Sequence, residues 1–137
     1  MAALTADSLH AGVVGILRAI PNITVYDGNV DDKPPADQYG FVLPYLVVWA
    51  SPGLAPAHPL SAGASFGMDW SVQITCAGGS QERVLQGLAL ARTALDCARP
   101  ASGSGPLIEQ PGSPMLLDRD VIPPRFFAAL RYRCYTA

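Results

Sequence analysis

The amino-acid sequence predicts a single α+β domain over residues 1–137, in which two helices pack on one face of a mostly antiparallel sheet. Two long segments alternate apolar and polar residues with the period of a β-strand, and two others repeat apolar residues with the period of an α-helix. The chain of 137 residues has the usual length of one domain. Half of its residues are hydrophobic and only 15% are charged, which excludes an intrinsically disordered chain.

The first part of the chain predicts a helix followed by two strands. Residues 5–20 carry one apolar stripe at helical spacing, Thr5 can serve as the N-cap, and Pro21 ends the helix. A short strand is expected over residues 23–26, and it is stopped by the turn pair formed by Asp27 and Gly28. Residues 27–39 have the composition of a loop. Residues 41–50 predict a strand whose first half, which contains Pro44, lies at an edge or a bulge.

The middle of the chain predicts a long loop, a strand and a second helix. Residues 51–65 are rich in proline and glycine and carry no formal charge, so they are expected to form a loop. Residues 66–76 predict a strand with a clear alternation, after which residues 77–79 make a turn. Ser80 is the expected N-cap of a helix that continues to Arg99 and is closed by Pro100. The apolar positions of the strand are Phe66, Met68, Trp70, Val72, Ile74 and Cys76.

The last part of the chain predicts three strands. Short strands are expected over residues 107–110 and 115–118, and residues 121–124 are extended because prolines follow. Residues 125–135 predict the final strand, in which one face is apolar. That face consists of Phe126, Ala128, Leu130, Tyr132 and Cys134, and the other of Phe127, Ala129, Arg131, Arg133 and Tyr135.

Charge and hydropathy exclude several classes of protein. The formal net charge is −2, whereas proteins that grip nucleic acid usually present a strongly basic surface. No apolar run approaches the roughly 20 residues that span a bilayer. The N-terminus lacks the basic and apolar regions of a secretory signal, so the chain is expected to be cytosolic when it is made.

The three cysteines predict neither a disulfide framework nor a zinc site. Cys76, Cys97 and Cys134 are an odd number and contain no Cys-x-x-Cys spacing. His10 and His58 lie far from them in the sequence, whereas a structural zinc site needs four closely spaced ligands. All three thiols are therefore expected to be buried small hydrophobic groups, above all Cys76 and Cys134, which share the parity of the apolar residues in their strands.

No motif indicates a metal site or catalysis. Residues 27–32 begin like a calcium loop, but Asp32 occupies the position that needs glycine, and Gln38 the position that needs glutamate. A nucleophilic site would need Ser or Cys beside His, and neither histidine lies in such a context. Arg131 and Arg133 could bind phosphate, but they are better explained as solvent-facing or subunit-contact residues. The sequence therefore predicts no enzyme, cofactor or metal.

The layout of the whole chain resembles the tail terminator proteins of phages with long, non-contractile tails. The resemblance lies in the order and spacing of several segments: the helix that ends at Pro21, residues 25–28 (VYDG) with the acidic loop behind them, and residues 44–48 (PYLVV). It continues through residues 70–79 (WSVQITCAGG), which lead into a helix, and residues 120–127 (DVIPPRFF), which enter the last strand. The uncharged loop over residues 51–65 departs from the pattern, since relatives often carry charge there.

This resemblance implies a structural protein of the virion tail that assembles in the host cytoplasm. Such a subunit forms a hexameric ring on the head-proximal end of the tail tube, stops tube polymerisation and presents the surface that joins the head. Its partners would be the tail tube protein and a head-completion or neck protein, and genomic DNA would only pass through the channel. The candidate interface residues are Asp31, Asp32, Leu54, His58, Leu60, Asp69, Arg125, Arg131 and Arg133.

Other functions stay open at this point. A head-closure or adaptor subunit of the neck is the first alternative, and a small enzyme or a monomeric ligand-binding domain is the second. We also expect residues 51–65 and 27–37 to be mobile in the free subunit and to become ordered against the tube or a neighbouring subunit. The cost of ordering a backbone, about 1–2 kcal/mol per residue, needs partner contacts to offset it in a segment with so few large apolar residues.

Overall fold

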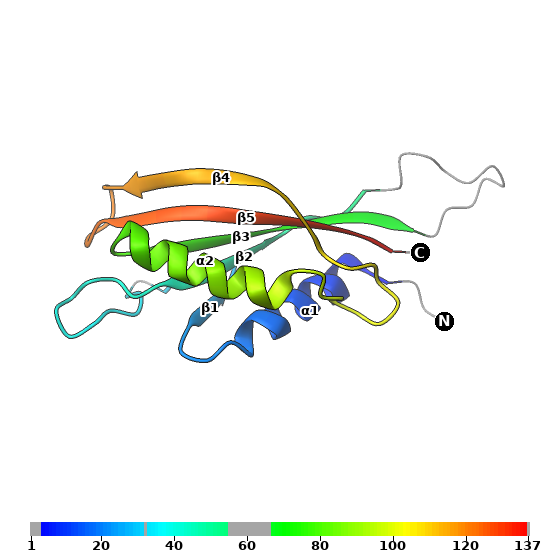
Figure 1. Ribbon diagram of the computed structural model, residues 1–137, viewed down its shortest axis with the longest axis horizontal. Coiled ribbons are helices and arrows are strands. Elements are labelled where there is room, and N and C mark those ends of the chain that lie inside the picture. Colours follow the sequence, from blue (N-terminus) through cyan, green and yellow to red (C-terminus); the bar gives the residue numbers. More distant parts are fainter. Residues whose placement is uncertain (1–3, 32, 55–66, 137) are drawn as a thin grey trace.

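The computed structural model describes residues 4–31, 33–54 and 67–136, which form two helices and five strands (Figure 1). Most of residues 51–65, which are predicted to be mobile, lie outside the described residues. In chain order the elements are α1 (Ala6–Arg18), β1 (Thr24–Asp27), β2 (Tyr45–Ala50), β3 (Met68–Gly78), α2 (Gln81–Leu95), β4 (Ile108–Asp118) and β5 (Arg125–Thr136).

The five strands form one sheet in the order β1-β2-β3-β5-β4. The pair β1–β2 is parallel, and the other three pairs are antiparallel. Helix α2 packs on β3 and β5, and α1 packs on β1, β2 and α2. The predicted α+β class, with a mostly antiparallel sheet and two helices on one of its faces, is thus confirmed (Figure 1).

The hydrophobic core lies between the two helices and the sheet. Both predicted N-caps are confirmed, because the side chains of Thr5 and Ser80 accept hydrogen bonds from backbone N–H groups in the first helical turns. The alternation predicted for the two long strands is also confirmed for the described residues, since their apolar positions join the core. The core positions on these strands are Trp70, Val72, Ile74 and Cys76 of β3, and Ala128, Leu130, Tyr132 and Cys134 of β5.

Strand β4 differs from its prediction. The sequence predicts two short strands at residues 107–110 and 115–118, whereas the structure has one strand from Ile108 to Asp118. Pro111 and Pro114 lie inside this strand, and its register with β5 shifts on both sides of Ser113. Because β4 is an edge strand with a neighbour on one side only, the missing N–H groups of the prolines interrupt a single ladder and the strand continues past them.

Two element boundaries differ from the predictions by four residues, and several others differ by one or two. Strand β2 begins at Tyr45 rather than at residue 41, because the chain before Pro44 folds back on itself through a bridge between Ala36 and Val42. Helix α2 ends at Leu95 rather than at Arg99. There the backbone of Cys97 takes a left-handed conformation with φ of 58°, which no helix continues.

The prediction that all three cysteines are buried is wrong for Cys97, which is exposed just after α2. It is confirmed for Cys76 and Cys134, which are fully buried. Burial raises the pKa of the Cys76 thiol to about 12 and also raises that of Cys134. We therefore expect a thiol reagent to label Cys97 rapidly in the native protein, and the other two only after unfolding.

Mass spectrometry of the labelled protein would check this expectation. The variant Cys97→Ser provides the control, because it should lose the rapid phase completely. Rapid labelling of Cys76 or Cys134 in that variant would contradict the strand registers described above.

Candidate functional site

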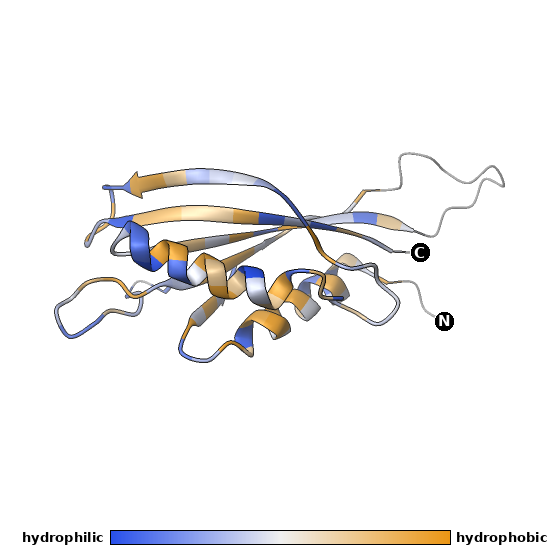
Figure 2. Ribbon diagram, viewed as in Figure 1, coloured by the Kyte–Doolittle hydropathy of each residue, from blue (hydrophilic) through white to orange (hydrophobic). Residues whose placement is uncertain are grey.

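The face of the sheet opposite the helices divides into an apolar half and a polar half. Near the β1–β2 side, a small apolar cluster is formed by Val42, Tyr45, Val47 and Ala77, with Tyr26, Val30 and Phe127 packed against it. Farther along β3 and β5 the same face is polar, and Figure 2 shows hydrophilic residues in that half of β5. We call this whole surface the open face. Its polar members are Asp69, Ser71, Gln73, Thr75, Arg131 and Arg133.

Arg133 and Asp69 form a two-point ion pair across the polar half of the open face. The Arg133 Nε donates to Asp69 Oδ1 at 2.7 Å, and a second guanidinium nitrogen donates to Oδ2. The hydrogen bonds from Arg133 lower the pKa of the Asp69 carboxyl. The guanidinium also lies 4.8 Å from the ring centre of Tyr135. These two predicted interface residues thus neutralise each other within the chain.

Arg131 presents an exposed cation on the same face. Among the described residues, none forms a hydrogen bond or an ion pair with its side chain. Together with Trp49, Ser71 and Gln73 it lines a shallow hollow of about 190 Å³. The Trp49 Nε1 donates a hydrogen bond to Thr75 Oγ1 at 3.1 Å, which orients the indole ring. The Trp49 side chain is nearly half exposed. This part of the face offers an aromatic surface beside a positive charge.

Arg125 lies at the apolar end of the open face. A hollow of about 200 Å³ is lined there by Tyr45, Trp49 and Phe127. A terminal guanidinium nitrogen of Arg125 donates to the Tyr45 hydroxyl at 2.8 Å, and its Nε is buried without a hydrogen-bond partner among the described residues. Burying a donor without a partner costs free energy, so an acceptor from another molecule would be stabilising here.

The structure brings four of the predicted interface residues together and places the others elsewhere. Asp69, Arg125, Arg131 and Arg133 share the open face. Leu54 is attached to its rim, because its backbone exchanges two hydrogen bonds of 2.8 Å with Asp69. Asp31 is exposed in the loop after β1. The remaining three, Asp32, His58 and Leu60, lie outside the described residues.

The connection between β1 and β2 carries the most exposed aromatic side chains of the described chain, which the sequence prediction of a loop over residues 27–39 did not single out. We call residues 35–43 of this connection the aromatic loop. Tyr39 is 76% exposed and Phe41 is 59% exposed. Figure 2 shows a hydrophobic stretch on this loop where it approaches β2. Together the two rings form an exposed apolar patch on this loop.

The aromatic loop is held by hydrogen bonds to one carboxylate. Asp37 Oδ1 accepts from the backbone N–H groups of Tyr39 at 2.9 Å and Phe41 at 3.0 Å. Its Oδ2 accepts from Arg83 of α2 at 2.7 Å, and Arg83 also donates to the Val42 carbonyl at 3.0 Å. Arg83 lowers the pKa of Asp37, which keeps the carboxylate charged. The two aromatic rings are therefore presented by a preorganised turn.

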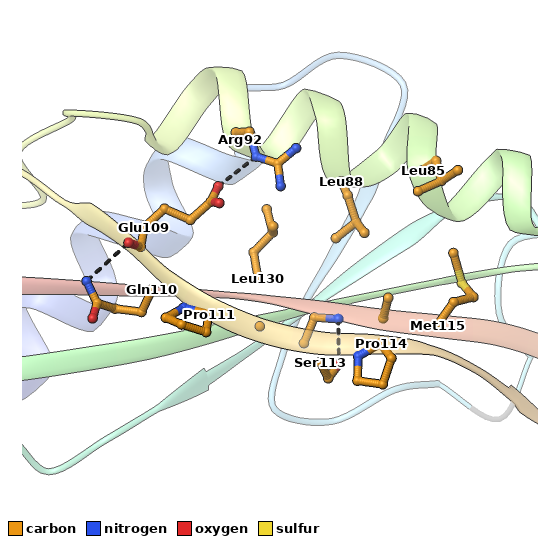
Figure 3. Close-up of a pocket in the computed structure, with 13 residues that line it drawn as sticks. Leu85, Leu88, Arg92, Glu109, Gln110, Pro111, Ser113, Pro114, Met115 and Leu130 are labelled. Carbon is orange, nitrogen blue, oxygen red and sulfur yellow. Dashed lines mark hydrogen bonds and ion pairs between the residues drawn. The ribbon is translucent and has the colours of Figure 1, made fainter.

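A groove separates α2 from β4, and we call it the α2–β4 groove (Figure 3). It has a volume of about 520 Å³, within the range of about 300–1,000 Å³ that is typical of binding pockets. Leu88 and Leu130 point toward each other across its floor, and Leu85 and Met115 lie at one end. The groove exists because β4 leaves its regular register with β5 around Ser113.

The other end of the α2–β4 groove is polar. Arg92 Nε donates to Glu109 Oε1 at 2.6 Å, and both side chains are partly exposed. The buried Tyr132 hydroxyl lies beside this pair, and burial, together with the Glu109 charge, raises the pKa of Tyr132 to about 12. The groove thus combines an apolar floor with a guanidinium at its end.

Within residues 4–31, 33–54 and 67–136, no three His, Cys, Asp or Glu side chains lie close enough together to hold a metal ion. In the same ranges, no helix has the length and hydropathy needed to cross a membrane. No protein-family model matches the chain, and no curated protein matches it either.

Proposed function

We propose that this chain is a structural subunit that caps the head-proximal end of a phage tail tube as a ring, stops tube polymerisation and provides the head-joining surface. One observation supports it most: exposed apolar groups gather in several parts of the domain surface. The aromatic loop, the open face and the α2–β4 groove are three such surfaces.

A subunit in a ring between two other assemblies needs several contact surfaces, because it meets two neighbouring copies, the tube and the neck. The side chains of the open face have the composition expected of a contact surface, in which aromatic residues and arginine are enriched. The order and spacing of residues 25–28, 44–48, 70–79 and 120–127 support the same proposal through their resemblance to tail terminators.

Deleting the coding sequence from the phage genome that carries it tests this proposal. We expect tails that are longer than normal and carry no heads when lysates are examined by electron microscopy. Expression of the chain from a plasmid should restore normal length and head joining. Tails of normal length that fail to join heads would assign the chain to head closure or to an adaptor instead. Tails of normal length that carry heads would contradict the proposal.

A further inference from the structure

The aromatic loop has the properties of a binding anchor. Aromatic residues in preorganised positions supply most of the affinity in many interfaces, because little conformational entropy is lost when they bind. Tyr39 and Phe41 are presented by a turn in which Asp37 accepts from both backbone N–H groups. Arg83 ties this turn to α2. The loop therefore does not need a partner for its own folding, although its side chains are left in water.

The α2–β4 groove and the aromatic loop border different sides of α2, because Arg83 holds the loop whereas Leu85, two residues later, lines the groove. The loop leaves the sheet between β1 and β2, and the groove borders β4 at the other edge (Figure 1). Its apolar floor and its volume suit large apolar side chains, and Leu85 at its rim is 58% exposed (Figure 3). One chain thus carries both an apolar projection and an apolar recess.

We propose that the aromatic loop of one copy docks into the α2–β4 groove of a second copy. This contact joins two different surfaces, so a docked pair still offers one free loop and one free groove, and repetition of such a contact closes a ring or extends a filament. The inference rests on the proposed function for its premise that the chain assembles with itself, and it names the surfaces that do so.

The Arg92 guanidinium at the end of the groove adds polar contacts to the apolar ones. Among the described residues, Arg92 donates only through Nε, to Glu109, which leaves its terminal nitrogens as donors. In Figure 3 the guanidinium extends over the floor of the groove. Such a guanidinium can stack on an aromatic ring or donate to the Tyr39 hydroxyl. Two aspartates before or within the loop are paired inside the chain, Asp27 with His10 and Asp37 with Arg83. The exposed Asp31 has no such pair among the described residues and can attract a cation.

Two complementary variants test the contact by sedimentation velocity. Tyr39→Ser with Phe41→Ser removes the projection, and Leu85→Lys places a charge at the groove. Each variant alone should associate at least about tenfold more weakly than the wild type, since anchor residues carry most of the affinity. Mixed together, they should form a one-to-one dimer and nothing larger, because one supplies only a groove and the other only a loop.

Two matched controls separate this effect from a general loss of apolar surface. Ile122→Ser removes an apolar side chain that is 94% exposed on the β4–β5 turn, and Leu90→Lys adds a charge on α2 outside the groove. Both should associate like the wild type. Circular dichroism of every variant should match the wild type, because all the substituted side chains are exposed.

A photo-crosslinker at position 41 gives a positive readout even where association is weak. Benzoylphenylalanine in place of Phe41 should crosslink to peptides around residues 85–92 or 109–115 of another copy. Crosslinks elsewhere, or none, would overturn the proposal, as would unchanged association of the Tyr39→Ser, Phe41→Ser variant. If these variants fail to change assembly while deletion still lengthens tails, the contact is wrong and the proposed function stands. If the crosslink forms but tails are unaffected by deletion, the contact stands and the proposed function is wrong.

Discussion

Trp70→Ala is expected to lower the free energy of unfolding by about 3–5 kcal/mol, the range for an aromatic residue removed from a packed core. Trp70 is fully buried on β3 and lies opposite Cys134 of β5 beneath the helices. Its Nε1 also donates to the Ser51 carbonyl at 3.0 Å, so the substitution leaves a cavity and removes a hydrogen bond. Urea denaturation followed by circular dichroism would measure the loss.

The second tryptophan of the chain provides the matched control. Trp49 lies on the open face and is nearly half exposed, so Trp49→Ala should cost about 1 kcal/mol or less. If the two substitutions had equal effects, the assignment of Trp70 to the core and of Trp49 to a contact surface would be wrong.

Gly12→Ala is expected to destabilise the protein by about 1–3 kcal/mol through overpacking. A Cβ at this position of α1 would lie 1.7 Å from the Pro100 carbonyl oxygen and 2.6 Å from its carbon. Backbone atoms cannot move aside as a flexible side chain can, so α1 or the segment after α2 must shift. The substitution is unfavourable even though alanine is the better helix former by about 1 kcal/mol.

Gly15 lies one turn farther along the same helix, and its Cβ would meet nothing within 4 Å. Gly15→Ala should therefore stabilise the protein by roughly 0.5–1 kcal/mol through helix propensity alone. Thermal or urea denaturation of the two variants measures both effects with one assay. Stabilisation by Gly12→Ala would contradict the close packing of α1 against Pro100.

The two glycines also show which features of this fold the sequence does not predict. In the sequence, Gly12 and Gly15 both count against a helix, and nothing distinguishes them. Only the tertiary structure, which brings Pro100 to α1, separates a close approach from an unused position. By contrast, the alternation in β3 and β5 predicts which residues face the core, because that pattern is local to each strand.

The candidate site was predictable where it depends on strand parity. Asp69, Arg131 and Arg133 share the open face because each has the polar parity of its strand. The ion pair between Asp69 and Arg133 depends on the register of two strands far apart in the sequence, so parity could not predict it. A local sequence pattern does not predict the register between two strands that are far apart in the sequence.

The aromatic loop was missed for a different reason. A loop assigned to residues 27–39 and a strand beginning at residue 41 separate Tyr39 from Phe41. The residue that could have indicated a common turn is Asp37, because an aspartate side chain can accept hydrogen bonds from backbone N–H groups a few residues later. Here it accepts from those of Tyr39 and Phe41. The α2–β4 groove had no signal in the sequence, since Pro111 and Pro114 indicate the end of a strand as readily as a bulge within one.

Electron microscopy of tail tubes assembled from purified tube protein, with and without this chain, tests the capping function itself. We expect a ring of this chain at one end of each tube and no further growth from that end. The Tyr39→Ser, Phe41→Ser variant should form no ring, and Leu90→Lys should form one. Tubes that bear no ring and keep growing in the presence of the wild-type chain would refute the capping function.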